Sequence, residues 1–323
     1  MKSIVYIVPY FGKLPNNFEM WLKGCEFNST IDWIIFTDDK TQYKYPKNVK
    51  VNYCSFDEIK KRIQNLYEVE IALDRPWKLC DYRPAYGEIF AEDIKDYDFW
   101  GYCDVDLMWG NIRKFITEDI LDKYNKVGFQ GHSTLYRNNR DINTIYRKEI
   151  DGITNYKQVF TSTEGYCFDE NIISDIFESM DIPYYREVNF AHLNKYEKSF
   201  YLGHLPRTED YKNEKQVFTW NRGKLLRHYL YKEKVFNEEF MYIHFFCRPI
   251  KYKLKSHSEI QSYIIYKDNV EQKEVDINEK FIKKYGSQSK IKFIIKTIYY
   301  NRKKITLRRI IINLKNFIRY KNR

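Results

Sequence analysis

Short apolar runs that end in polar residues recur through the first half of the chain. Runs of this length, bounded by turn residues, are typical of buried strands, and the segments between them carry apolar residues at helical spacing. One of these segments opens with Ser55-Phe-Asp-Glu58, a capping box that predicts a helix start. The strands that we expect cover residues 3–8, 32–36, 49–54 and 99–103. This alternation predicts an α/β fold with helices on a central sheet.

The strand expected at residues 99–103 runs directly into two carboxylates, Asp104 and Asp106. Ligands of open α/β sheets bind at the carboxyl ends of the strands. Two carboxylates separated by one residue can share a divalent cation such as Mg²⁺ or Mn²⁺, while Val105 between them points back toward the core. The alternative is a strand end with solvated acids, because Asp-x-Asp is a common tripeptide.

A second informative segment is Lys78-Leu-Cys-Asp81-Tyr-Arg83-Pro84. Proline suits the first turn of a helix, so Pro84 predicts a helix over residues 85–94. Asp81 and Arg83 would then lie at or just before a helix N-terminus, which is a natural anion site. The alternative is an Asp–Arg pair that caps and braces this helix.

The segment 78–87, the strand that leads into Asp104-Val105-Asp106 and the following Gly110-Asn111 together resemble a known family. The resemblance is to nucleotide-sugar glycosyltransferases of the GT-A fold, of a bacterial type found in surface-polysaccharide synthesis, and it covers roughly residues 1–250. It implies a GT-A-like (Rossmann-like) central mixed sheet flanked by helices. It also implies transfer of a hexose from a UDP-sugar to a growing capsule, O-antigen or lipopolysaccharide acceptor, which is lipid-linked or an oligosaccharide.

The resemblance implies a metal site as well. Mn²⁺ or Mg²⁺ would be held by Asp104 and Asp106, and several enzymes of this fold add a histidine from a late strand. His244 lies in such a strand, at residues 239–249, so it is the candidate third ligand. A core histidine is the alternative explanation.

Contacts to the donor are implied for residues at the other strand ends. Tyr10 could stack on uracil, Gly12 could allow close approach of the backbone, and an ordinary turn explains both equally well. Asp38 or Asp39 could accept a bond from the nucleoside, or serve a turn. The full set of predicted donor contacts is Tyr10, Gly12, Asp38, Asp39, Lys78, Asp81, Arg83, Asp104, Val105 and Arg248.

The catalytic base of an inverting transfer is expected in the acidic segment at residues 163–170, which leads into a helix expected over residues 171–180. Its candidates are Asp169, ranked first by the resemblance, Glu170 and Glu164. Acids at a helix start also interact favourably with the helix dipole, which is the alternative. His132, beside a glycine, is a weaker candidate for substrate contact.

Composition changes this picture little. Aromatic residues make up 18% of the 323 residues, with 30 tyrosines, which suits sugar binding but also an AT-rich genome. Six cysteines lack CxxC spacing, which argues against a zinc knuckle or a disulfide framework and indicates a cytoplasmic protein. The short N-terminal apolar run is interrupted by Pro9 and predicts no signal peptide.

Positive charge is concentrated at the end of the chain. Residues 283–323 contain 14 Lys and Arg and no Asp or Glu, so subtracting them from the formal charge of +11 leaves −3 for residues 1–282. Apolar residues recur at helical spacing within this tail. A basic amphipathic helix predicts peripheral attachment to an anionic membrane, here the inner face of the cell membrane. The apolar stripe and the lack of a binding motif argue against nucleic acid.

We therefore expect a glycosyltransferase domain at 1–255, with a donor-binding part at about 1–130 and an acceptor part at about 131–255. A helical, basic extension would follow at 256–323. Two other functions stay open at this point. A nucleotidyl- or phosphotransferase acting on nucleotide sugars should carry a glycine-rich phosphate loop, which the sequence lacks. A non-catalytic adaptor at a membrane surface would leave the acids merely solvated.

Overall fold

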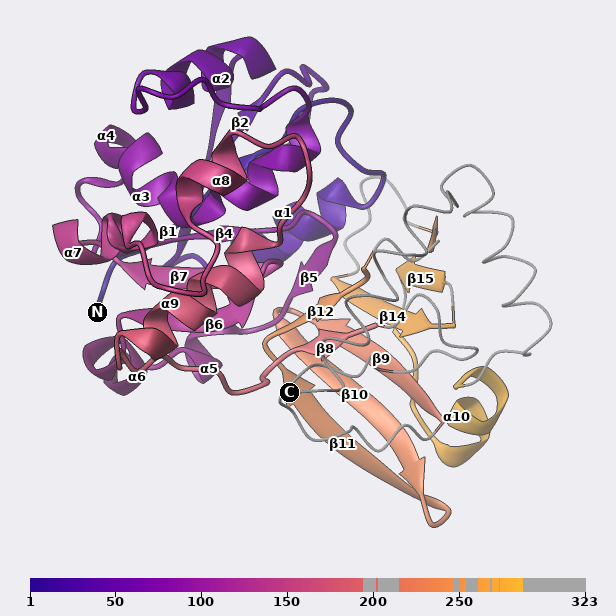
Figure 1. Ribbon diagram of the computed structural model, residues 1–323. Coiled ribbons are helices and arrows are strands. Elements are labelled where there is room, and N and C mark those ends of the chain that lie inside the picture. Colours follow the sequence, from indigo (N-terminus) through magenta and orange to yellow (C-terminus); the bar gives the residue numbers. More distant parts are fainter. Residues whose placement is uncertain are drawn as a thin grey trace, which may run out of the picture. The chain divides into compact units, whose positions relative to one another are not determined.

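The structure is a computed structural model of the 323-residue chain, and it divides the chain into two compact units, Met1–Glu187 and Val188–Arg323. Each unit is described by itself (Figure 1). The residues that the structure describes are 1–193, 202, 215–246, 250–253, 261–267, 269–272 and 274–286. The basic tail beyond residue 286, and with it the predicted amphipathic helix, lies outside them.

The first unit is built on a six-stranded sheet in the order β3-β2-β1-β4-β7-β6. Its strands are β1 (Ile4–Pro9), β2 (Asp32–Thr37), β3 (Val49–Tyr53), β4 (Phe99–Cys103), β6 (Lys126–Gln130) and β7 (Ser133–Arg137). Strands β3, β2, β1 and β4 run parallel, whereas β7 and β6 are antiparallel additions. The predicted α/β class with a central mixed sheet flanked by helices is confirmed.

The strand order contains a topological switch point between β1 and β4. From β1 the chain builds β2 and β3 on one side and then returns to add β4 on the other side. Parallel pairing aligns the carboxyl ends of β1 and β4, since Ile4 pairs with Phe99 and Ile7 with Tyr102. Ligands of open α/β sheets bind at such a point.

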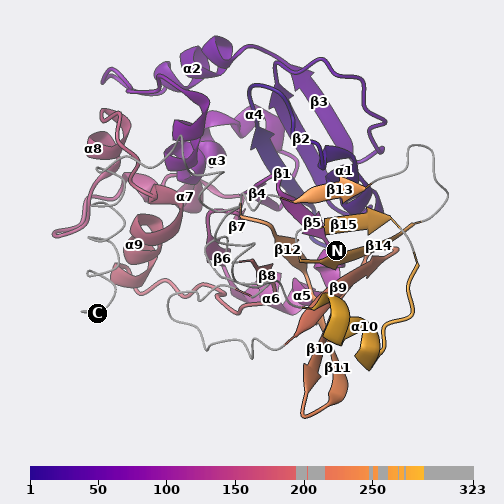
Figure 2. The same cartoon turned by 90° about the vertical axis from the view of Figure 1, so that its right-hand side faces the viewer.

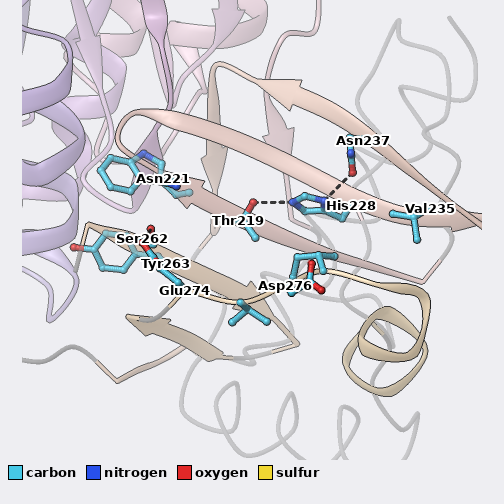
Figure 3. Close-up of a pocket in the computed structure, with 12 residues that line it drawn as sticks. Thr219, Asn221, His228, Val235, Asn237, Ser262, Tyr263, Glu274 and Asp276 are labelled. Carbon is cyan, nitrogen blue, oxygen red and sulfur yellow. Dashed lines mark hydrogen bonds between the residues drawn. The ribbon is translucent and has the colours of Figure 1, made fainter.

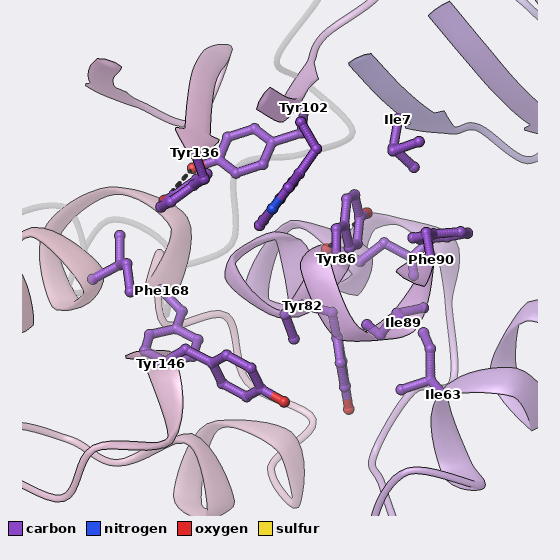
Figure 4. Packing of buried hydrophobic residues seen from close by; sticks show 14 of the residues in the cluster. Ile7, Ile63, Tyr82, Tyr86, Ile89, Phe90, Tyr102, Tyr136, Tyr146 and Phe168 are labelled. Atoms are coloured by element: carbon purple, nitrogen blue, oxygen red, sulfur yellow. Dashed lines mark hydrogen bonds between the residues drawn. The ribbon is translucent and has the colours of Figure 1, made fainter. Parts of the chain in front are cut away.

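Alternating side chains of the sheet enter two separate cores. Val5 and Ile7 of β1 belong to the larger core, where they meet the helices that lie on the same side of the sheet in Figure 2. Figure 4 shows part of this packing, in which rings such as Tyr86 and Phe90 fill the space between sheet and helices. Burial of these aromatic rings supplies much of the hydrophobic stabilisation of the unit.

The opposite face of the sheet carries a cluster of Tyr6, Trp21, Trp33 and Trp109. Tyr6 of β1 stacks on Trp33 of β2 with ring centroids 5.8 Å apart, and Trp33 also meets Trp21 and Trp109 at 6.1 and 6.2 Å. Trp21 comes from α1 (Phe18–Phe27) and Trp109 from the short strand β5 (Leu107–Trp109). This tryptophan cluster fixes α1 against the sheet.

The remaining helices of the first unit are short. They are α2 (Phe56–Gln64), the 3₁₀ helix η1 (Pro76–Ala85), α3 (Tyr86–Ile89), α4 (Ala91–Ile94), α5 (Ile112–Phe115), α6 (Glu118–Lys123), α7 (Arg140–Asn143), η2 (Ile145–Arg147), α8 (Tyr156–Phe160), η3 (Phe168–Ile172) and α9 (Ile173–Ser179). The capping box predicted at Ser55 and Glu58 is present and opens α2.

Two predicted helices are wrong in detail. The helix expected over 85–94 is instead a 3₁₀ helix followed by two single turns, and Pro84 lies inside η1. A 3₁₀ turn accepts this proline because the chain has not yet entered the α-helical hydrogen-bonding pattern. The sequence also predicts one helix over residues 111–124, but this segment is broken into α5 and α6 between Ile116 and Thr117, where the backbone turns extended.

The second unit contains another six-stranded sheet, in the order β11-β10-β9-β14-β15-β13. Its strands are β9 (Gln216–Asn221), β10 (Lys224–Tyr231), β11 (Lys234–Phe240), β13 (Lys251–Lys253), β14 (Ser262–Tyr266) and β15 (Asn269–Gln272), and α10 (Glu279–Tyr285) follows. The glycine of Asn221-Arg-Gly223, in a short loop between two strand-like segments, predicts a hairpin, and β9 and β10 form it. Its two central residues, Arg222 and Gly223, both have positive φ, as a tight hairpin turn requires.

Residues 258–285, expected to be helical, contain two strands. Ser262–Tyr266 is fully buried, and β-branched and aromatic residues of this kind favour a pleated, buried strand. The helix was predicted from the polar residues around this segment, and only α10 is helical as predicted. The structure thus divides the chain after Glu187, whereas the sequence suggested a division near residue 255.

Two short strands complete the second unit, β8 (Ala191–His192) and β12 (Tyr242–His244), which pair in parallel. Across the described part of the chain, no helix combines the length and the hydropathy that crossing a bilayer requires.

Candidate functional site

The loop after β1 is held by the acids that follow β2. The Gly12 amide donates to Asp38 Oδ1 at 2.7 Å, and the Leu14 amide donates to Asp39 Oδ2 at 2.8 Å. Gly12 has a φ of +90°, which favours glycine. Hydrogen bonds from Thr41 and from the Leu14 amide lower the pKa of Asp39. These acids therefore shape the loop, as in the turn alternative.

Tyr10 begins the same loop at the end of β1. Its amide donates to the Phe36 carbonyl at 2.8 Å, which continues the pairing with β2 by one residue. Its ring is half-buried. A stacking role for Tyr10 stays a prediction.

The Asp-x-Asp segment follows β4 at the switch point. Val105 is buried, as expected, and its carbonyl accepts a bond from Asn17 at 3.3 Å. The Asp104 carbonyl accepts from the Trp21 indole at 3.2 Å, so α1 fixes this backbone from behind. The Asp104 side chain is 29% exposed, whereas the strand before it is buried. The segment thus presents carboxylates at the rim of the sheet on a rigid backbone.

Arg83 connects this segment to a second carboxylate. Its guanidinium donates to Asp104 Oδ1 at 2.5 Å, to Asp169 Oδ2 at 2.9 Å and to the Gly131 carbonyl at 2.6 Å. The guanidinium also lies over the ring of Tyr102, 5.3 Å from its centroid. The Arg83 side chain is 13% exposed. A planar, forked cation held in this way joins residues far apart in the sequence.

Lys78 and Asp81 form a different kind of pair. Lys78 Nζ donates to Asp81 Oδ2 at 2.8 Å and to the carbonyls of Val159 and Glu164 at 3.0 and 2.5 Å. All three ammonium donors are used, and the side chain is fully buried. The Asp81 carboxylate also accepts bonds from the amides of Tyr166 and Phe168.

This geometry favours the structural alternative for both residues of the pair. The brace predicted between Asp81 and Arg83 is instead formed by Asp81 with Lys78. It secures residues 164–168, which lead into η3, rather than the start of the helix expected at 85–94, because the amides of Tyr166 and Phe168 provide the remaining hydrogen bonds. The predicted donor contacts of Lys78 and Asp81 have no support in this arrangement.

Asp169 and Glu170, the first two base candidates, lie in η3 and meet the backbone of Gly131. The Gly131 amide donates to Glu170 Oε1 at 3.0 Å. A Cβ at position 131 would lie 2.5 Å from Asp169 Oδ2 and 3.0 Å from Glu170 Oε1. Any larger residue at position 131 would therefore force the two carboxylates to move.

Asp169 is buried with its side chain 5% exposed. Burial raises its pKa to about 7, against the opposing effect of the Arg83 charge, and the Glu170 carboxylate adds to the rise. A carboxyl group with a pKa near neutrality can exchange a proton at physiological pH, as general acid–base catalysis requires. Perturbed groups of this kind tend to gather at functional sites.

Sequence reasoning missed Gly131 and the bond from the Tyr102 hydroxyl to the Asp169 carbonyl, 2.9 Å long. Gly128-Phe-Gln-Gly131, with two glycines before His132, was the available signal. His132 is buried, and its carbonyl accepts a bond from the Asp104 amide at 3.1 Å.

Glu164, His244 and Arg248 are the remaining predicted site residues. Glu164 exposes its side chain and uses its carbonyl to bind Lys78. His244 lies in β12 of the second unit, where its Nδ1 is 2.9 Å from Nδ1 of His192. Arg248 lies outside the described residues.

The residues at the end of β4 fit a divalent metal by their chemistry. Asp104 and Asp106 provide hard carboxylate oxygens, which Mg²⁺ and Mn²⁺ prefer, and the intervening Val105 side chain is turned inward. With Arg83 beside them, the site combines an anionic metal ligand set with a fixed cation, an arrangement that can stabilise a diphosphate.

Comparison with the profiles of known protein families shows to which family the chain belongs. The profile of the DUF6625 family matches residues 6–274, most of the chain. The chain belongs to DUF6625, a family of unknown function. The matched range of this DUF6625 chain includes the switch-point site and most of the described part of the second unit. No curated protein matches it.

Two solved structures illustrate a distant likeness to this DUF6625 chain. One is the galactosyltransferase LgtC in complex with donor and acceptor sugar analogs, which is 10% identical and covers 60% of this chain and 76% of its own, at a TM-score of 0.35. Another is mouse xyloside xylosyltransferase 1 in its apo form, which is 10% identical and covers 60% of this chain and 88% of its own, at a TM-score of 0.36. Likeness at this level assigns neither activity nor substrate.

Proposed function

We propose that this protein is a metal-dependent glycosyltransferase, a hexosyltransferase that uses a UDP-sugar donor. The observation that carries the proposal is the Asp104–Arg83–Asp169 connection at the switch point between β1 and β4. It brings together a candidate metal-binding carboxylate, a fixed cation and a carboxyl group with a near-neutral pKa. These are the groups that departure of a nucleoside diphosphate and deprotonation of a hydroxyl need.

In this proposal the donor diphosphate lies beside Asp104 and Asp106. A bound Mn²⁺ or Mg²⁺ would supply Lewis-acid stabilisation of the leaving diphosphate, with these two carboxylates as ligands. Arg83 would contribute charge-assisted hydrogen bonds to the same oxygens, and its anchoring by Asp169 and Gly131 fixes the guanidinium beforehand. A third ligand role for His244 is part of the proposal, argued from the sequence alone.

Asp169 would act as the base of an inverting transfer. Its carboxylate takes the proton of the acceptor hydroxyl while that oxygen bonds to the anomeric carbon. The bond from the anomeric carbon to the diphosphate oxygen breaks, and UDP leaves with the electron pair. The raised pKa of Asp169 suits this task better than the exposed side chain of Glu164, the third candidate.

The acceptor, the partners and the location are further parts of the proposal, and they rest on the sequence resemblance and the basic tail. The acceptor would be a lipid-linked or oligosaccharide intermediate of a bacterial surface polysaccharide, such as capsule or lipopolysaccharide. The tail at residues 283–323 would hold the enzyme on the anionic inner face of the cell membrane.

Calorimetric titration of UDP, with and without Mn²⁺, tests the donor site. We expect binding that requires the metal and that is lost in Asp104→Ala. The matched control is Asp151→Ala, which removes an exposed aspartate from a turn of the same unit and should bind UDP as the wild type does. A panel of UDP-sugars with a transfer assay follows. If neither UDP nor another nucleoside diphosphate binds with metal present, the proposal fails.

A further inference from the structure

The second unit contains a pocket on one face of its sheet (Figure 3). Its volume is about 640 Å³, within the range of small-molecule sites. Thr219 of β9, His228 of β10 and Asn237 of β11 line it from three neighbouring strands, and residues 274–277 line it from the segment before α10.

The pocket occupies the polar half of a sheet face whose other half is apolar. Side chains that alternate along β9 and β14 point to this face, and α10 covers one end of it through Ile282. The residues packed there are Val217, Leu230, Ile264, Tyr266 and Ile282. The same face also carries Thr219, His228 and Ser262, and the first two lie directly across from Ile264 and Val217 of this cluster, so polar and apolar side chains border each other there.

A neutral imidazole lies at the centre of the polar half. His228 Nδ1 is 2.7 Å from Asn237 Oδ1, and its Nε2 is 2.7 Å from the Thr219 hydroxyl. Burial lowers the pKa of His228, so the ring is uncharged at neutral pH. With the Asn237 oxygen as acceptor, the ring carries its proton on Nδ1 and accepts the Thr219 hydroxyl proton at Nε2.

This assignment leaves a fixed set of groups for a ligand. The Asn237 amide nitrogen can donate, the lone pairs of the Thr219 oxygen can accept, and the exposed Asp276 carboxylate can accept. Val235 and Ile277 add apolar surface to the lining. Alternating donors and acceptors beside apolar surface match a sugar ring, whose hydroxyls both donate and accept and whose C–H groups are apolar.

The charges of the pocket select among such ligands. Glu274 and Asp276 are its charged lining residues, and the described lining contains no lysine or arginine. Two carboxylates repel a phosphate or diphosphate and attract an amine. The pocket is therefore unsuited to a nucleotide, in contrast to the switch-point site with Arg83.

We propose that this pocket binds a saccharide that carries no phosphate, either neutral or amine-bearing, as part of the acceptor. The inference rests on the proposed glycosyltransfer for its place in the reaction, whereas the binding itself can be measured without any transfer. The asparagine and threonine that orient the imidazole provide the recognition of hydroxyls, and the carboxylates provide the selection against phosphate.

Saturation-transfer NMR on the full chain, with galactose, glucosamine and glucose 1-phosphate as probes, tests the pocket. We expect galactose and glucosamine to bind, and glucose 1-phosphate to bind at least about fivefold more weakly because of the two carboxylates. Val235→Trp should obstruct the pocket and weaken both sugars at least about tenfold. Absence of binding by both sugars would overturn the proposal.

Lys234→Trp is the matched control, because adjacent residues of β11 point to opposite faces of the sheet. It places the same side chain on the same exposed strand and should leave sugar binding unchanged, and thermal unfolding shows whether each variant is folded. Equal effects of the two variants would contradict the proposal. Asp276→Asn should reduce the preference for glucosamine over galactose by about fivefold without weakening galactose.

The UDP titration separates this inference from the proposed function. Loss of sugar binding in Val235→Trp with unchanged, metal-dependent UDP binding supports the pocket and leaves the donor site intact. Sugar binding that survives Val235→Trp refutes the pocket alone. Failure of UDP to bind the wild type refutes the donor site, while the sugar result still decides whether the pocket binds saccharides.

Discussion

Two cations of η1, Lys78 and Arg83, lie five residues apart, and the ion pairs that they form differ in nearly every physical respect. Lys78 with Asp81 is sealed, since both side chains are at most 3% exposed and every ammonium donor is used. Arg83 with Asp104 is partly open, with side chains 13% and 29% exposed. The closed pair can only hold structure, whereas the open pair can exchange a protein contact for a ligand.

The choice of cation follows the same division. An ammonium group is compact and can be enclosed by one carboxylate and two carbonyls, as around Lys78. A guanidinium is planar and can bind two carboxylates at once, as Arg83 does with Asp104 and Asp169. Burial of each cation thus indicates its role better than its proximity to the Asp-x-Asp segment.

The largest expected effect is on stability, at the closed pair. Lys78→Met leaves Asp81 buried without its cation, so the free energy of unfolding should fall by about 3–5 kcal/mol. Denaturant unfolding measures this change. Lys157→Met is the control, because it removes an exposed ion pair with Glu149 and should cost less than about 1 kcal/mol.

A double variant sharpens this test. Lys78→Met combined with Asp81→Leu removes both charges, and it should recover part of the loss because no unpaired charge stays buried. A cost below about 1 kcal/mol for Lys78→Met alone would show that the pair is not a brace.

The next effect is on ligand binding, at the open pair. Arg83→Met should weaken metal-dependent UDP binding about 10- to 100-fold, which is the loss of charged hydrogen bonds. Its cost in stability should be smaller than that of Lys78→Met, because Asp104 is partly solvated and Asp169 can take up a proton. Calorimetry and denaturant unfolding of one preparation give both values.

Arg83→Lys refines the comparison at the open pair. It keeps the positive charge but loses the planar, forked set of N–H donors. The UDP affinity of this variant should therefore lie between those of the wild type and Arg83→Met. Wild-type affinity in both variants would exclude Arg83 from the donor site.

A further effect concerns pH. The folded pKa of Asp169, about 7, lies above the value of about 3.9 for an unfolded aspartate, so the folded protein holds a proton that the unfolded chain has lost. The stability that Asp169 contributes is therefore complete below about pH 4 and is lost as the pH rises to about 7.

Asp169→Asn should remove this decline in the free energy of unfolding, which amounts to at most about 1.4 kcal/mol per pH unit. The asparagine keeps a side-chain oxygen that can accept a hydrogen bond from Arg83. Unfolding free energies of wild type and variant, measured at several pH values, give the difference curve. Parallel curves would mean that Asp169 is ionised throughout and has no raised pKa.

The smallest effect is expected from Glu170→Gln. Its carboxylate adds to the rise in the Asp169 pKa, and the variant keeps an oxygen for the Gly131 amide. The pH midpoint at which the stability contributed by Asp169 is lost should therefore move by a few tenths of a unit to lower pH. A shift to higher pH would contradict the charge interaction between these neighbours.

The elements were predictable from sequence where the signal is local. Buried strands such as Phe99–Cys103 are short apolar runs, and the capping box at Ser55 and the hairpin turn at Arg222-Gly223 depend on neighbouring residues. The breaks inside the helix expected at 85–94 could not be read in this way, because tertiary packing around Pro84 decides between a 3₁₀ and an α-helical turn.

The site was predictable as a set of residues but not as a set of pairings. Asp81, Arg83 and Asp104 were all singled out, yet the partner of each depends on contacts between distant segments. Arg83 and Asp169 are 86 residues apart, and the sequence contains no periodicity that would pair them. Gly131 was missed because its role is to leave room for the two carboxylates, and the two glycines before His132 do not indicate which side chains approach them.

The tryptophan cluster behind the sheet has a consequence for spectroscopy. Trp21, Trp33 and Trp109 lie in asymmetric contact at fixed distances, so the first unit should give strong near-ultraviolet circular dichroism. The part of this signal that comes from the tryptophan cluster originates on the face of the sheet opposite the larger core, whose own aromatic rings add to the total. That part will persist when a substitution disturbs only the ligand site, and it will be lost when α1 detaches from the sheet.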